Sequence, residues 1–143
     1  MNKNFDFSSV SLTVIDININ ASPDMYVNAN GVTFTKRVLE DMSYPSYVQY
    51  CVDPGRAIFA VRACKGTESR AVKFSKPAGE QANTLNCNSR ALFDVVTHLI
   101  PNYADKKRYK VEGHYDADNK IMYYDLSTAV VSMFRRNDRD DEE

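Results

Sequence analysis

The sequence predicts an α+β fold of two similar strand-helix-hairpin units related by a pseudo-twofold axis, with short helices packed on antiparallel sheet. Three observations predict this fold: alternating apolar residues typical of strands, two short stretches with helical spacing, and the repeated order strand, helix, proline, hairpin. We expect residues 10–76 to form the first unit, 77–84 a linker and 85–134 the second unit. A flexible N-terminus (1–9) and a charged, disordered tail (135–143) would flank them.

The first unit begins with a bent strand over residues 10–20. Its apolar residues occupy every second, even-numbered position as far as Val14. From Ile15 they occupy every second, odd-numbered position. One extra residue swaps the two faces of a strand, so this slip predicts a bulge or a bend. Residues 25–27 extend the same sheet.

A strand at Val32 and Phe34 leads into a short helix over residues 36–42. Thr35 is the expected N-cap, accepting a hydrogen bond from the Val38 amide. Pro45 closes the helical region. A hairpin follows, with strands from Tyr47 to Val52 and from Ile58 to Arg62 around an Asp-Pro-Gly-Arg turn.

The second unit repeats this order after a short strand over residues 71–74. An extended piece at 85–87 precedes Asn88, the expected cap, and a helix over residues 90–100 that Pro101 ends. The expected apolar stripe of this helix contains Ala91, Leu92, Val95, Val96 and Leu99.

The second hairpin has strands at 109–114 and 121–126 around a turn at 116–119. Asp116, Asp118 and Asn119 resemble a calcium loop in residue type, but the glycine and the distal glutamate of such loops are missing, so we interpret them as turn residues. Residues 127–134 fit a short helix or a strand.

The run from Val32 to Met42, VTFTKRVLEDM, followed by a proline and by the hairpin ending in Ile58-Phe59-Ala60-Val61-Arg62, resembles the AbrB-type transition-state regulators. In that family a strand, a short helix and a hairpin from two units interleave as a swapped-hairpin barrel that binds DNA. The resemblance implies a nucleic-acid-binding regulator. The stretch also resembles small uncharacterised proteins of bacteria and their phages.

The charge is unevenly distributed, although its net value is only −1. Residues 36–110 carry 13 Lys and Arg against 7 Asp and Glu, a net +6, whereas DRDDEE at 138–143 carries −4. A basic middle with an acidic tail suits a polyanionic partner. The predicted nucleic-acid contacts form two clusters: Lys106, Lys107, Arg108, Tyr109 and Lys110, with cations for phosphates and a ring for stacking, and Arg62, Lys65, Arg70 and Lys73.

A protein-interaction or assembly module, with a protein partner or a second copy on the edge strands, is the alternative function. No nucleophile-base-orienter set marks an enzyme, because His114 beside Asp116 and Asp118 lacks a nucleophile or a metal. We therefore predict a non-enzymatic protein with no cofactor, no metal and no membrane association, and the sequence identifies no small-molecule substrate. Three cysteines without a CxxC pair indicate reduced thiols and a cytoplasmic location.

The nucleic-acid interpretation predicts a gel shift of random duplex DNA at low salt that weakens steeply at high salt, because phosphate contacts release counterions. Replacing Lys106, Lys107 and Arg108 together by Ala should abolish it. A wild-type chain that gives no shift at low salt would refute DNA binding, whereas unchanged binding by the triple variant would refute this site alone.

Overall fold

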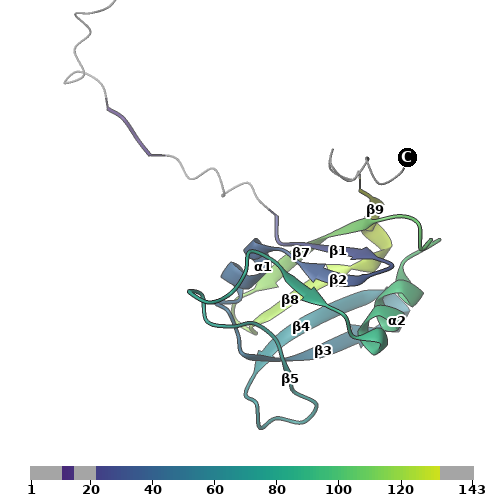
Figure 1. The fold of residues 1–143 in the computed structure, drawn as a ribbon, viewed down its shortest axis with the longest axis horizontal. Helices are drawn as coiled ribbons and strands as arrows, with labels where there is room; N and C mark the ends of the chain where they lie inside the picture. Colours follow the sequence, from purple (N-terminus) through teal and green to yellow (C-terminus); the bar gives the residue numbers. More distant parts are fainter. Residues whose placement is uncertain (1–10, 15–21, 133–143) are drawn as a thin grey trace, which may run out of the picture.

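The chain folds into one curled antiparallel sheet with two short helices (Figure 1). The computed structural model describes residues 11–14 and 22–132. The strands are β1 (Asp24–Asn28), β2 (Gly31–Phe34), β3 (Tyr47–Asp53), β4 (Ile58–Cys64), β5 (Val72–Lys73), β6 (Leu85–Cys87), β7 (Tyr109–Asp116), β8 (Ile121–Asp125) and β9 (Val130–Val131). The helices are α1 (Lys36–Asp41) and α2 (Arg90–Leu99), with 3-10 turns η3 (Pro54–Arg56) and η4 (Leu126–Thr128).

The strand order is β5-β3-β4-β8-β7-β1-β2-β6, and β9 pairs with β7. Every pairing is antiparallel. The sheet curls into a half-barrel whose two edges are β5 beside β3 on one side and β6 on the other (Figure 1). We call the opening between these edges the seam.

Aromatic rings fill the inside of the curl. The Phe34 and Phe74 rings meet edge to face with centroids 5.3 Å apart, and the Phe59 and Tyr124 rings stack at 6.0 Å. All four residues are buried, and each buried aromatic removes a large apolar area from water. These contacts join strands from both halves of the sequence into one core.

The predicted fold class was wrong. The strands of the two expected units do not form separate sheets, because β4 pairs with β8 and β1 lies between β7 and β2. The helices lie at opposite ends of the sheet and bury only two residues from α1 and three from α2 (Figure 1). Local patterns specify element types, whereas pairing between distant strands depends on tertiary contacts that local patterns do not record.

Most individual elements match the sequence predictions, including both helices and both hairpins. The caps differ. Thr35 donates its hydroxyl to the Asp24 carbonyl at 2.9 Å and makes no side-chain cap, and Ser89, not Asn88, accepts from the Leu92 amide at 3.2 Å. The ambiguous C-terminal stretch contains η4 and then β9.

The predicted leading strand is only partly within the described residues. Residues 11–14 form no strand, and residues 10 and 15–20 lie outside the described part of the chain. The N-terminus at 1–9 and the tail at 135–143 also lie outside it. In the described segments, no helix is both long enough and apolar enough to cross a membrane.

Gly113 in β7 fits a position where a side chain would collide with the core. Its amide donates to the Pro23 carbonyl at 3.1 Å. A Cβ atom there would lie 2.6 Å from the Pro23 oxygen and 2.7 Å from Cε2 of the buried Tyr124 ring. Neither group is the far end of a flexible side chain, so the backbone at Pro23 and the packed Tyr124 ring would both have to shift.

We therefore predict that Gly113→Ala lowers the free energy of unfolding by about 1–3 kcal/mol through overpacking. Urea denaturation with matched m-values measures this change. Gly79→Ala is the control, because a Cβ at Gly79 meets nothing within 4 Å, and its effect should stay within about 0.5 kcal/mol or be slightly stabilising. Equal stability of the two variants would contradict the steric explanation.

Candidate functional site

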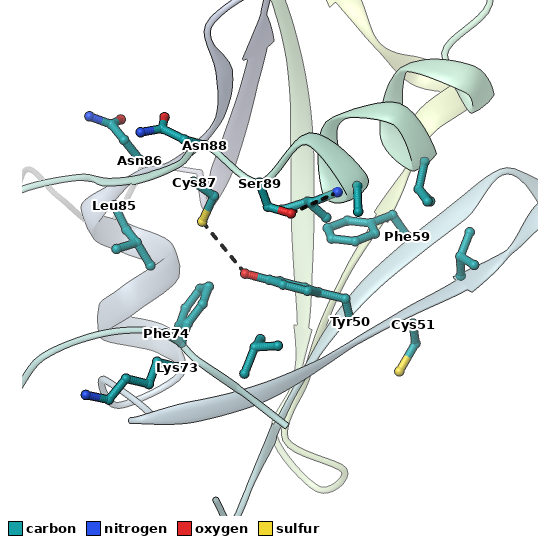
Figure 2. Close-up of a pocket in the computed structure, with 15 residues that line it drawn as sticks. Tyr50, Cys51, Phe59, Lys73, Phe74, Leu85, Asn86, Cys87, Asn88 and Ser89 are labelled. Carbon is teal, nitrogen blue, oxygen red and sulfur yellow. Dashed lines mark hydrogen bonds between the residues drawn. The ribbon is translucent and has the colours of Figure 1, made fainter. Parts of the chain in front are cut away.

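The seam contains a cavity with a volume of about 560 Å³, which we call the seam pocket (Figure 2). β3 and β4 form one wall, β5 and Phe74 the next, and β6 with the first turns of α2 the opposite wall. This volume lies in the range typical of protein ligand sites.

Apolar side chains dominate the lining. Tyr50, Phe59, Phe74, Leu85 and Leu92 form the inner surface. Three valines stand at the mouth and stay partly exposed: Val52 at 44%, Val72 at 38% and Val95 at 42%. Isolated exposed valines are ordinary, but these three come from β3, β5 and α2 and gather around one opening, which is typical of a binding surface.

The backbone of β3 is unpaired along part of the seam. β5 pairs only with Tyr47 and Val48, and the Phe74 amide donates to the Ser46 carbonyl at 2.8 Å. In an antiparallel ladder, alternate residues direct their N–H and C=O groups to the same side. Tyr50 and Val52 therefore direct theirs into the seam, where no described strand pairs with them.

The direction of the edge strands matters for what could fit between them. Six antiparallel pairings separate β3 from β6 along the sheet: β3–β4, β4–β8, β8–β7, β7–β1, β1–β2 and β2–β6. Since six is even, β3 and β6 run in the same direction. One additional strand in the seam can thus be antiparallel to both edges at once.

The pocket has few polar groups, and most of them form hydrogen bonds within the protein. The Tyr50 hydroxyl lies 3.7 Å from the Cys87 Sγ, within hydrogen-bond distance (Figure 2). The Ser89 hydroxyl caps α2, and Lys73 points away from the cavity at its rim (Figure 2). Burial raises the pKa of Cys87, and the hydrogen bond from Tyr50 opposes this shift only in part, so the thiol stays protonated at neutral pH.

A second cavity of about 370 Å³ continues the groove along α2. It shares Val52 and Val95 with the seam pocket and extends between Pro54 and the helix residues Asp94 and His98. The two cavities together form a groove along the free edge of β3, which suits an extended ligand better than a compact one.

The first predicted basic cluster lies at the start of β7. Lys106 and Lys107 are exposed in the preceding loop, and the Arg108 guanidinium lies 3.9 Å from the centroid of the Tyr26 ring. Tyr109 is buried, and its hydroxyl accepts from the Ala104 amide and donates to the Asn102 carbonyl, so its ring is not available for base stacking. Lys110 pairs with Tyr26 across β1 and β7.

The second predicted cluster lies around the ends of β4 and β5. Arg62 donates twice to the Gln49 side chain, at 2.8 and 3.1 Å. Lys65, Arg70 and Lys73 are exposed, and Arg70 has a positive φ of 60° in the loop before β5. Of the nine predicted contact residues, only Lys73 lines the seam pocket.

Strand register separates the two clusters. Tyr109 is the first residue of β7, whereas Arg62 is level with its last residue, because Arg62 pairs with Ile121 and Ile121 pairs with Asp116. Seven residues of strand correspond to about 23 Å. The two clusters therefore do not form one continuous basic surface.

The groups considered for catalysis or metal binding are not assembled. His114 is exposed and its ring lies 5.4 Å from the Tyr123 ring. The Asp116 carboxylate accepts from the Asp118 and Asn119 amides and from the Asn119 side chain, which lowers its pKa and confirms the turn. The described residues contain no group of three or more His, Cys, Asp or Glu that could hold a metal ion.

Most residues of the seam pocket were not predicted from the sequence as a binding site. Val95 was assigned to the buried stripe of its helix, but the buried residues of α2 are Leu92, Phe93 and Val96, so the buried face is rotated by one position. The signal that could have found the site is a helix with more apolar residues than one buried face needs. Tyr50 and Val52 look like ordinary alternating strand residues, and nothing local shows that their strand is an edge.

We predict that the rate of Cys87 alkylation rises with pH at a midpoint above that of N-acetylcysteine. The rate is measured in the full chain with Cys51 and Cys64 replaced by Ser. Burial disfavours the reactive thiolate, so the rate appears only at higher pH. Tyr50→Phe removes a hydrogen bond that favours the thiolate and should move the midpoint further up. A midpoint at or below the reference would show an activated thiol and would contradict a passive role for Cys87.

Comparisons with known proteins give no assignment. No family model, no curated protein and no solved structure matches this chain. The likeness of VTFTKRVLEDM to AbrB-type regulators stays a prediction, and the function has to be inferred from the geometry of the site.

Proposed function

We propose that this protein is a non-enzymatic protein-interaction module that binds an extended, apolar peptide segment as an added strand in the seam. The observation that carries the proposal is the free backbone edge at Tyr50 and Val52 beside an apolar pocket. Strand addition uses these two features together, with main-chain hydrogen bonds for affinity and side-chain pockets for specificity.

The partner's backbone can satisfy groups that are otherwise left to water. Each main-chain hydrogen bond contributes a net of about 0.5–1.5 kcal/mol. Two residues on β3 offer up to four such groups, and a strand in this position is antiparallel to β6 as well. The seam therefore favours a strand over a helix or a loop.

The partner's side chains must alternate. One face of an added strand would point into the cavity between Phe74 and Leu92, while the other would face solvent. The inner surface carries no charged side chain, so apolar residues at every second position fit it best.

Nucleic-acid binding has weaker support in the geometry. The exposed Lys106 and Lys107 favour it, but the second cluster is level with the other end of β7 and Tyr109 is part of the core. A polyanion needs cations along a continuous track. We also propose a cytoplasmic location, because Cys51, Cys64 and Cys87 are all free.

Strand addition predicts that ten-residue peptides selected from a displayed library on the wild-type chain share alternating apolar residues. Their affinity, measured by calorimetry, should fall at least tenfold, about 1.4 kcal/mol, on Val52→Lys, because the lysine places a charge at the mouth of the pocket. N-methylation of every second backbone nitrogen of a selected peptide should abolish binding when it blocks the nitrogens that face β3. Methylation of the other set of nitrogens should leave binding unchanged.

Val130→Lys is the matched control. Val130 is a similarly exposed valine, at 53%, on β9 away from the seam. Binding that survives Val52→Lys, or that tolerates methylation at every peptide nitrogen, would refute strand addition at this edge.

A further inference from the structure

Leu12 and Val14 are exposed apolar residues that the fold does not use. Their side chains are 77% and 97% exposed, and residues 11–14 join no strand. Leu12 and Val14 alternate with Ser11 and Thr13, so one face of this segment would be apolar in an extended conformation. The segment has the pattern that the seam pocket requires of a ligand.

The segment and the site also match in charge and in length. Residues 11–14 carry no charge, and neither does the inner surface of the pocket. The edge of β3 beyond its pairing with β5 runs from residue 49 to residue 53, which accommodates a strand of four residues. Leu12 and Val14, two positions apart, would then point into the cavity together.

A second copy of the chain is the occupant that this arrangement favours. In the single chain, residues 11–14 stand clear of the sheet (Figure 1). The seam pocket is lined by residues of β3, β5 and β6. A chain that carries both a ligand segment and its site can exchange segments reciprocally with one partner. Reciprocal exchange gives a closed twofold dimer in which both seams are filled.

We propose that two copies of this protein associate by exchanging residues 11–14, each segment adding a strand to the seam of the other copy. Leu12 and Val14 enter the seam pocket, and the segment's backbone pairs with Tyr50 and Val52. This inference rests on the proposed function, since it uses the same edge and the same pocket. It names the partner as a second copy of the chain.

Sedimentation velocity over a range of concentrations tests the exchange in the full chain. The wild type should dimerise, and Leu12→Asp with Val14→Asp should weaken the dimer at least tenfold. Ser11→Asp with Thr13→Asp is the matched control, because it adds the same charge to the same segment on the alternate positions and should leave the dimer intact. Neither pair threatens folding, since all four residues are exposed.

A mixing experiment tests whether the segment of one chain binds the pocket of another chain. The double variant Val52→Lys, Val95→Lys has a disabled pocket and an intact segment. The double variant Leu12→Asp, Val14→Asp has an intact pocket and a disabled segment. Each variant alone should be monomeric, but their mixture should form heterodimers, because an intact segment then meets an intact pocket. Circular dichroism verifies that the lysine variant is folded.

A wild-type chain that stays monomeric at the highest concentration, or a dimer that the Asp pair at 12 and 14 leaves unchanged, would overturn the inference. A mixture that remains monomeric would also overturn it, because an intact segment would then fail to bind an intact pocket on another chain. If library peptides still bind the seam in these cases, the proposed function stands without the exchange. If Val52→Lys changes neither the affinity for library peptides nor the affinity of the dimer, both proposals fail.

Discussion

Backbone N–H and C=O groups at the edge of a sheet need hydrogen-bond partners. This need is the central constraint on the fold, because the sheet curls without closing and so leaves two edges. The aromatic core formed by Phe34, Phe59, Phe74 and Tyr124 holds the curl, since these rings join β2, β4 and β8 with the residue after β5. Among the described residues β3 and β6 do not pair with each other, and of the strands only the two-residue β5 pairs with the seam side of β3.

The partial closure is visible in the hydrogen bonds near Phe74. β5 covers the first two residues of β3, and the Phe74 and Ser75 amides extend this cover by donating to Ser46 and Pro45. Beyond Val48 the pairing with β5 ends, and Arg70 in the loop before β5 has a positive φ that is not strand geometry. The unpaired edge and the apolar pocket are therefore two consequences of one short strand.

Sequence patterns predicted local structure well and long-range structure poorly, for a physical reason. Both helices follow from apolar spacing and from the prolines after them, which act within a few residues, although the predicted caps Thr35 and Asn88 were wrong. The α+β class failed because β4–β8 and β1–β7 pairings connect residues far apart, and no local pattern specifies them. The candidate site depends on those same pairings, so it could not be predicted: Tyr50 and Val52 become edge residues only because β5 begins at Val72 and pairs with β3 no further than Val48.

Side chains around the seam indicate how much edge is left open. Proteins protect exposed edges with charges, prolines and short strands, because a free edge recruits other chains. Here Lys73 ends β5 on one side, and Asp53 followed by Pro54 ends β3 on the other. Between them the edge residues Tyr50 and Val52 have no such protection, and the residue between them, Cys51, is uncharged. An edge protected at both ends and open in the middle admits a strand of a few residues and limits its extension, which is how a sheet can bind one segment without templating a larger aggregate.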